Sequence, residues 1–216
     1  MRILFYGDSI TDAGRERDND EFSFKLGLGL GLGFANYVAQ ELSFEKPGRY
    51  EFINRGVGGN RVVDLYARIK ADCWNHKPDV VSFMVGINDV WPFPDEGNGV
   101  ELDRYEKVYR MMLDDTLAKL PNVKIILGEP FFLKGSAAEI DYPKWDGTPN
   151  VRDYANVVRK LAKEYGFPCL SLQKKLEDAA GDEPSLYLYD GIHPTPAAVK
   201  LIATAWLKIF KEQIEK

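Results

Sequence analysis

The chain has 216 residues, a length typical of one α/β domain, and we expect a single domain over residues 1–216. Hydrophobic residues make up 45% of the chain and charged residues 28%, which excludes a disordered, collagen-like or coiled-coil protein. Because 28 Lys and Arg face 33 Asp and Glu, the formal net charge is -5, and we expect no nucleic-acid partner.

The N-terminal segment Met1 to Gly7 reads as a strand and lacks the charged flank, long apolar stretch and cleavage site of a signal peptide. This predicts a cytoplasmic location unless a leader has been removed. No apolar run approaches the roughly 20 residues that a membrane-spanning helix needs. The two cysteines, Cys73 and Cys169, are too few for a disulfide framework, and we expect both to be reduced.

Short runs of apolar, β-branched or aromatic residues predict five strands. Two of these runs are almost continuously apolar, which is typical of strands buried on both faces of a parallel sheet. The predicted strands are Ile3 to Tyr6, Phe52 to Ile53, Val80 to Val85, Val123 to Leu127 and Phe167 to Leu172.

Between and after these runs, apolar residues recur at spacings of three and four, which predicts amphipathic helices. Strands and helices alternate along the chain, and this order indicates a three-layer α/β/α sandwich. The fold class is therefore α/β with a five-stranded parallel sheet, and we expect the flavodoxin-like strand order. The predicted helices are Phe34 to Phe44, Val62 to Trp74, Leu102 to Leu120, Val151 to Tyr165 and Pro196 to Ile214.

Two segments interrupt this alternation. Gly27 to Gly33 alternates glycine with leucine, and we interpret it as a loop leading into a helix. Its glycines do not follow a strand directly, so a dinucleotide site is disfavoured. Pro92 to Gly99 is a second loop, which we expect to border the functional face. His76 follows a helix, and we interpret it as a solvated cation.

Open parallel sheets bind ligands at the carboxyl ends of their strands, so the loops after the strands are candidates for the site. Ser9 follows the first strand, and Asp190 and His193 lie in one short segment before the last helix. Acyl transfer needs a nucleophile, a base and a group that orients the base. Ser9, His193 and Asp190 have these three chemistries, although alone each could be a helix cap or a loop residue.

A developing oxyanion also needs hydrogen-bond donors. The backbone N–H groups of Ser9 and Gly59 and the side-chain amide of Asn88 follow three different strands, and we expect these donors to converge. Gly58 could replace Gly59 in this role. We choose Gly59 from the register of the motif.

Four short sequence blocks occur in order along the chain: Gly7-Asp8-Ser9-Ile10, Gly59, Gly86-Ile87-Asn88-Asp89 and Asp190-Gly191-Ile192-His193-Pro194. They resemble the blocks of the SGNH hydrolases, also called GDSL-type esterases and lipases. The resemblance implies a flavodoxin-like fold, a Ser9–His193–Asp190 triad, and Ser9, Gly59 and Asn88 as oxyanion donors. The segments 7–15, 54–65 and 86–91 are similar to the bacterial carbohydrate-deacetylating branch, which includes acetyl xylan esterases. Ala198 departs from the glycine that is frequent there.

These observations predict a serine esterase that removes a short acyl group, in particular acetyl, from a carbohydrate through an acyl-enzyme, with no metal and no cofactor. Three alternatives stay open. The first is a lysophospholipase or thioesterase acting on longer chains, and the second is a catalytically silent binding protein. The third, a metal-dependent phosphoesterase using Asp8, Asp12 and Asp89, is disfavoured because no Gly-rich phosphate loop with a lysine accompanies them.

Aromatic residues in the predicted loops, namely Trp91, Phe93 and Trp145, are candidates for stacking on sugar rings or lining an acyl pocket. The same residues would serve equally well to pack a loop or a subunit interface. A homo-oligomer is therefore a further expectation, by analogy with the family.

Overall fold

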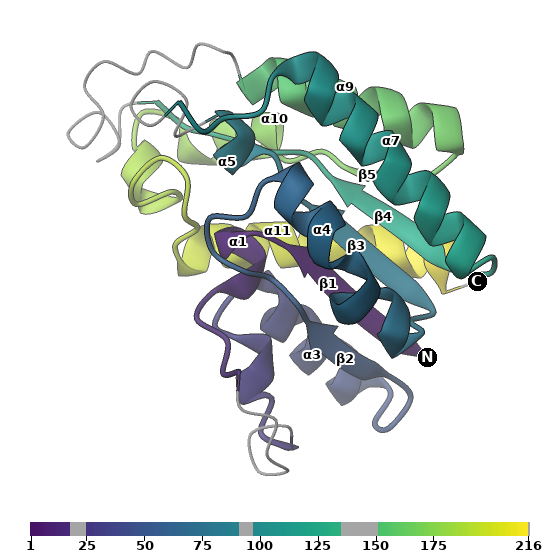
Figure 1. Cartoon of the computed structure of the whole chain (residues 1–216). Helices are drawn as coiled ribbons and strands as arrows, with labels where there is room; N and C mark the ends of the chain where they lie inside the picture. Colours follow the sequence, from purple (N-terminus) through teal and green to yellow (C-terminus); the bar gives the residue numbers. More distant parts are fainter. Residues whose placement is uncertain (18–24, 91–96, 135–150, 216) are drawn as a thin grey trace.

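The computed structural model describes residues 1–17, 25–90, 97–134 and 151–215. Its sheet has five strands, all parallel, in the order β2-β1-β3-β4-β5 (Figure 1), which confirms the predicted fold class and the flavodoxin-like order. The strands are β1 (Arg2–Gly7), β2 (Glu51–Asn54), β3 (Val80–Met84), β4 (Lys124–Gly128) and β5 (Cys169–Leu170).

The topology places a switch point beside β1. The chain leaves β1 and returns as β2 on one side, whereas β3 pairs with β1 on the other side. Loops that diverge from neighbouring strands in this way leave a crevice at the carboxyl edge of the sheet. Gly7, Asn54 and Met84 end the three strands that border this crevice.

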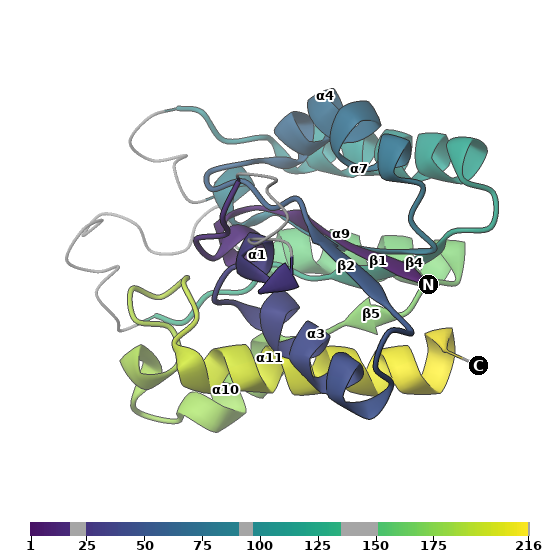
Figure 2. The ribbon, with the colours of Figure 1, turned by 90° about the horizontal axis from the view of Figure 1, so that it is seen from below.

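Helices cover both faces of the sheet (Figure 2). One face carries α3 (Phe34–Glu45) and α11 (Pro196–Ile209), which pack against each other. The other face carries α4 (Val62–Asp72), α7 (Leu102–Lys119) and α9 (Val151–Tyr165), with α7 between the other two. The predicted sandwich is therefore present, and the buried stripe of α7 is as expected, with Tyr105, Tyr109, Met112, Leu113 and Thr116 buried.

The core lies on both sides of β1 and β3, whose residues Ile3 to Tyr6 and Val80 to Met84 are all buried. Trp206 of α11 is the largest fully buried side chain among the described residues, and its indole Nε1–H donates to Ser82 Oγ of β3 at 3.0 Å. This bond satisfies the two buried polar groups and fixes how α11 lies on the sheet.

Several predicted boundaries change in the structure. The run 167–172 contains only the short strand β5, because the following residues lead into a helix that the sequence analysis missed, α10 (Gln173–Ala180). That helix buries only Leu176 and Ala180, too few to give a periodic pattern. The loop Gly27–Gly33 contains one 3₁₀ turn, η1 (Leu28–Leu30).

His76 is a correction to the sequence analysis. It ends the 3₁₀ turn η2 (Trp74–His76), and its Nε2 accepts a hydrogen bond from Arg55 Nε at 3.2 Å. Partial burial, followed by the charge of Arg55, lowers the pKa of His76 below its usual value. The residue is therefore a partly buried hydrogen-bond acceptor and not a solvated cation.

The remaining short elements are α1 (Ser9–Asp12), α5 (Ile87–Val90), η3 (Pro184–Leu186) and the π-helical turn η4 (Phe210–Ile214). Within the described ranges, no helix has the length and apolar character needed to cross a bilayer. Trp91, Phe93 and Trp145, and most of the Pro92–Gly99 loop, lie outside the described residues.

Candidate active site

A sharp turn after β1 presents Ser9 at the carboxyl edge of the sheet. Asp8 caps α1, and its carboxylate accepts the Ile10 N–H at 3.0 Å, so Ser9 becomes the first helical residue. A Cβ on Gly7 would lie 2.3 Å from both the carbonyl oxygen of Met84 and Oγ1 of Thr11. Only glycine therefore lets the strand approach its neighbour and then turn directly into the helix.

The structure brings Ser9 and His193 together although 184 positions separate them in sequence. Ser9 Oγ lies 2.8 Å from His193 Nε2. On the other side of the imidazole ring, Nδ1 lies 2.5 Å from Asp190 Oδ2. This chain of hydrogen bonds has the connectivity that general-base activation of a hydroxyl requires.

The Asp190 carboxylate is held by its own turn. Its Oδ1 accepts the backbone N–H groups of Ile192 at 2.9 Å and His193 at 2.7 Å. Leu188 and Pro194 close the segment by an antiparallel bridge. The three-residue spacing in the sequence therefore produces a rigid turn in which carboxylate and imidazole face each other.

The electrostatics of this pair favour an ion pair when His193 is protonated. Burial opposes ionisation of Asp190, but the hydrogen bonds from the side chain and backbone of His193 outweigh it and lower the pKa of Asp190 to about 2. The hydrogen bond to Asp190 in turn raises the pKa of His193, against partial burial. Asp190 therefore stays ionised and makes His193 a stronger base.

Residues 57–60 form a β-turn beside Ser9, closed by the Asn60 N–H, which donates to the Val57 carbonyl at 3.2 Å. Gly59 has a φ of +79°, the left-handed value that favours glycine at this point of the turn. The Gly58 N–H donates to Asp12 Oδ2 at 3.2 Å. Among the described residues the Gly59 N–H has no hydrogen-bond partner, so it is the Gly59 donor that remains for a ligand.

Asn88 lies in α5, directly after β3. Its Nδ2 donates one hydrogen bond to the Asn60 carbonyl at 3.1 Å, which fixes the amide against the 57–60 turn. An amide nitrogen carries two N–H bonds, so one donor is left for a ligand. The structure therefore places the Asn88 amide against the turn that contains Gly59, and Gly58 of that turn lies next to Ser9.

The carboxylates considered for a metal have other partners. Asp12 accepts Gly58 N–H and contacts Arg17, and Asp89 accepts the Val62 N–H at both oxygens, at 3.1 and 3.2 Å. Burial raises the pKa of Asp8 to about 7 and that of Asp89 to about 8. In the described part of the chain, no three His, Cys, Asp or Glu side chains group as metal ligands.

A pocket of about 210 Å³ opens beside Ser9 and His193, between α1, α3 and α11. Its wall is apolar apart from these two side chains. At its edge Leu32 is 86% exposed. The other lining residues are Ile10, Ala13, Gly33, Phe34, Pro194, Val199 and Ile202.

Sequence reasoning missed two features of the site. Tyr189, 58% exposed, stacks on the His193 ring with 6.0 Å between the centroids and 28° between the planes. The adjacency of Tyr189 to Asp190 was the only signal for it. Asp12 contacts the 57–60 turn, and the spacing between Asp12 and Ser9 gave no indication of that contact.

A flavodoxin-like sheet with a Gly-Asp-Ser turn after β1 and a histidine segment before the last helix is the architecture of the SGNH hydrolases. The model of the GDSL-like lipase/acylhydrolase family matches residues 5–201. The chain is 36% identical to an acetylxylan esterase from Geobacillus stearothermophilus over 214 residues, which cover 96% of this chain and 92% of that protein. The chain therefore belongs to the GDSL-like lipase/acylhydrolase family and is a carboxylic ester hydrolase of the SGNH type.

Solved structures agree with this assignment. A putative GDSL-like lipase from Parabacteroides merdae superposes with a TM-score of 0.85 at 34% identity and covers 96% of this chain and 94% of its own. The crystal structure of Axe2, an acetylxylan esterase from Geobacillus stearothermophilus, has a TM-score of 0.81 at 35% identity, with coverages of 96% and 92%.

Proposed function

We propose that this protein is a serine esterase that hydrolyses short-chain acyl esters of a carbohydrate, acetyl esters above all, with Ser9 as nucleophile. The observation that carries the proposal is the 2.8 Å contact between Ser9 Oγ and His193 Nε2. Asp190, on the other ring nitrogen at 2.5 Å, orients the imidazole.

In the first half of the reaction, Ser9 Oγ attacks the ester carbonyl carbon while its proton passes to His193 Nε2. The carbonyl oxygen becomes an oxyanion, which the N–H groups of Ser9 and Gly59 and the amide of Asn88 stabilise. When the tetrahedral intermediate collapses, the carbon–oxygen bond to the sugar breaks. His193 gives its proton to the departing alkoxide, and an acyl-enzyme on Ser9 remains.

In the second half, water takes the place of the alcohol. His193 accepts a proton from the water molecule as its oxygen attacks the acyl carbon. The second tetrahedral intermediate collapses, the bond to Ser9 Oγ breaks, and the serine recovers its proton from His193. A carboxylic acid leaves, and the enzyme returns to its starting state without any external reactant except water.

Two further observations support the assignment of the residues and the substrate. Catalytic mutants of Axe2, in which a serine or an aspartate is replaced by alanine, have been crystallised. That enzyme is described as an acetylxylan esterase and as an acetyl-xylooligosaccharide esterase. The carbohydrate substrate proposed for this chain rests on that similarity.

A second candidate is an acyl hydrolase acting on longer chains, and the apolar pocket of about 210 Å³ beside Ser9 favours it. A pocket lined by Leu32, Val199 and Ile202 offers apolar contacts that an acetyl group leaves unused. A series of p-nitrophenyl esters from acetate to octanoate separates the two candidates. A maximum at acetate supports the short-chain esterase, and a maximum at hexanoate or octanoate supports the alternative.

The primary test is the intact mass after incubation with a fluorophosphonate, followed by peptide mapping. We expect a single adduct on Ser9, none in Ser9→Ala, and full labelling in the matched control Ser43→Ala, which changes an exposed serine of α3. Acetate release from acetylated xylo-oligosaccharides should disappear only in Ser9→Ala. Absence of labelling on folded wild-type protein would exclude the serine mechanism.

A further inference from the structure

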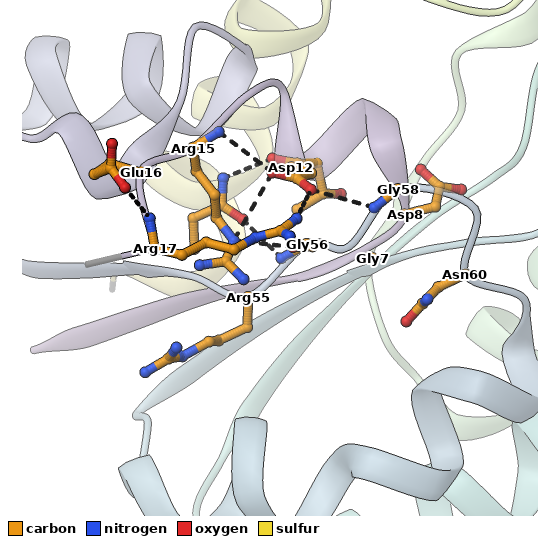
Figure 3. Close-up of polar contacts among 12 residues, drawn as sticks. Gly7, Asp8, Asp12, Arg15, Glu16, Arg17, Arg55, Gly56, Gly58 and Asn60 are labelled. Atoms are coloured by element: carbon orange, nitrogen blue, oxygen red, sulfur yellow. Dashed lines mark hydrogen bonds and ion pairs between the residues drawn. The ribbon is translucent and has the colours of Figure 1, made fainter. Parts of the chain in front are cut away.

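Asp12, which ends α1, makes the only side-chain hydrogen bond from the helix carrying Ser9 to the 57–60 turn, among the described residues. Its Oδ2 accepts the Gly58 N–H at 3.2 Å and faces Arg17 Nη2 at 2.5 Å. Its Oδ1 accepts the Arg15 backbone N–H at 3.2 Å. Figure 3 shows the carboxylate between these groups, with dashed lines to both arginines and to Gly58.

The helix and the segment leading into the turn are also in direct backbone contact. A Cβ on Gly56 would lie 2.2 Å from the Asp12 nitrogen. The Gly56 carbonyl accepts Arg15 Nε at 2.9 Å, and the Val57 N–H donates to the Gly7 carbonyl at 3.1 Å. The segment up to residue 57 is therefore fixed without the Asp12 side chain, whereas Gly58 depends on it.

The hydrogen bond from the Gly58 N–H to Asp12 also restricts the direction of the neighbouring Gly59 N–H, because of the geometry of the turn. The peptide group between Val57 and Gly58 is held at its N–H by Asp12 and at its carbonyl by the Asn60 N–H, which donates at 3.2 Å. The next peptide group carries the Gly59 N–H. Because peptide groups are planar and each is joined to the next by two dihedral angles, fixing the first restricts the direction of the second.

We propose that Asp12 is a positioning residue that aims the Gly59 N–H at the oxyanion by holding the Gly58 N–H. The inference rests on the proposed esterase function and adds to it a link between the nucleophile helix and the oxyanion donor. Asp12 does not touch the reacting atoms. Its effect should appear in the stabilisation of the tetrahedral intermediate, not in the ionisation of His193, because the groups that shift the pKa of His193 are Asp190 and Asp8.

Arg17 supports the carboxylate from the solvent side. Its side chain is 58% exposed, so its ion pair with Asp12 is worth little on its own. The Arg55 guanidinium points away from Asp12 in Figure 3 and contacts His76 instead. We therefore expect Arg17→Ala to lower kcat by less than about threefold, whereas loss of the Asp12 acceptor has the larger effect.

The test compares three substitutions at one position with kcat and KM for p-nitrophenyl acetate, normalised to the active sites titrated by fluorophosphonate. Asp12→Asn keeps an oxygen for the Gly58 N–H, Asp12→Leu has a similar size without an acceptor, and Asp12→Ala removes the side chain. Removal of an oxyanion donor typically costs 10²–10³ in kcat, so a misaimed donor should cost about 10- to 100-fold. Asp178→Ala on α10 is the matched control.

We expect kcat to fall about 10- to 100-fold in Asp12→Leu and Asp12→Ala, with KM and the midpoint of the pH profile unchanged, and to stay within about threefold in Asp12→Asn. If Asp12→Ala does not fold, the comparison of Asp12→Leu with Asp12→Asn still tests the inference. Equal activity of Leu and Asn, or a shifted pH midpoint, would overturn the inference. Inactivity of the wild-type protein would instead overturn the proposed function, so the two failures are distinguishable.

Discussion

The Asp89 carboxylate accepts the Val62 N–H at both of its oxygens, at 3.1 and 3.2 Å, and thereby ties α5, the short helix after β3, to the start of α4. Asp89 is completely buried, and burial raises its pKa to about 8. The hydrogen bond from Val62 favours the ionised form, but it does not outweigh the loss of hydration.

This relationship predicts a pH-dependent stability. With this pKa, Asp89 keeps its proton in the folded protein up to about pH 8, whereas the unfolded chain releases it near its usual value of 3.8. The folded state therefore binds more protons between these values, and the contribution of Asp89 to stability falls as the pH rises through that window. Asp89→Asn cannot titrate, so it should unfold with a free energy higher than wild type by at least about 1 kcal/mol at pH 9.

Urea denaturation at pH 5 and pH 9 measures this difference. At pH 5 the two proteins should be closer in stability than at pH 9. Asp178→Asn, on an exposed position of α10, is the control and should show the wild-type pH dependence. A gap between Asp89→Asn and wild type that is the same at both pH values would contradict the burial of an ionisable Asp89.

The activity should also depend on pH through His193. Catalysis needs the neutral imidazole, and the hydrogen bond to Asp190 raises the pKa of His193 above its usual value of 6.5. The value of kcat/KM should therefore rise with pH, with a midpoint above 6.5. In Asp190→Asn the midpoint should move down, and kcat should fall by roughly 10⁴-fold because the imidazole loses its orientation.

A pH series from 5 to 9 with p-nitrophenyl acetate gives both the midpoint of the pH profile and kcat. The control is Asp103→Asn, which changes an exposed carboxylate at the start of α7. An unchanged midpoint in Asp190→Asn would mean that Asp190 does not act on the imidazole.

Gly56 should tolerate no side chain. A Cβ there would lie 2.2 Å from the nitrogen and 2.7 Å from the Cα of Asp12, both backbone atoms that cannot move away independently. We expect Gly56→Ala to lower the free energy of unfolding by about 1–3 kcal/mol or more, as overpacking does. Gly29→Ala is the matched control, because its Cβ would meet only the Glu16 carbonyl at 3.7 Å.

Thermal or urea denaturation of these two variants, together with an ester-hydrolysis assay, tests this prediction. Gly56→Ala should lose both stability and activity, because α1 and the segment before the 57–60 turn would be forced apart. Equal stability of both variants would show that the close approach does not exist in solution.

The pocket between α1, α3 and α11 should determine the acceptance of longer acyl chains. Val199 lines it from α11, and Val199→Phe would fill part of its volume of about 210 Å³. We expect hydrolysis of p-nitrophenyl hexanoate to fall about tenfold relative to acetate, which needs little of the pocket. Thr204→Phe, at an exposed position of the same helix, is the control. An equal loss of activity toward the acetate and the hexanoate would mean that the acyl chain does not bind in this pocket.

The sheet was predictable from the sequence because its central strands are buried on both faces. The run Val80–Val85 is apolar except for Ser82 and is buried throughout, which is typical of a strand in a parallel sheet covered by helices on both sides. By contrast, α10 has only two buried residues and gives no periodic signal, so the sequence analysis missed it. The run 167–172 predicted a strand there, but not that β5 would have only two residues.

Candidate site residues that lie close together in the sequence were predictable. Asp190 and His193 face each other because three positions in a tight turn suffice, and the sequence shows that spacing directly. Which glycine of the 57–60 turn presents its N–H was open, since Gly58 and Gly59 are equivalent in sequence. The structure separates them through one hydrogen bond, from Gly58 to Asp12, across 46 positions.

The sequence by itself determined the order of elements, the residues of the core and the chemical identity of the candidate site, because hydrophobic period and local spacing depend on neighbours along the chain. Only the tertiary structure decided what long-range contacts control: the 2.8 Å approach of Ser9 to His193, the lowered pKa of His76 and the raised pKa of Asp89. The burial of a titratable group and the direction of an N–H donor depend on residues that the fold brings together from distant parts of the chain. Local sequence patterns therefore do not predict them.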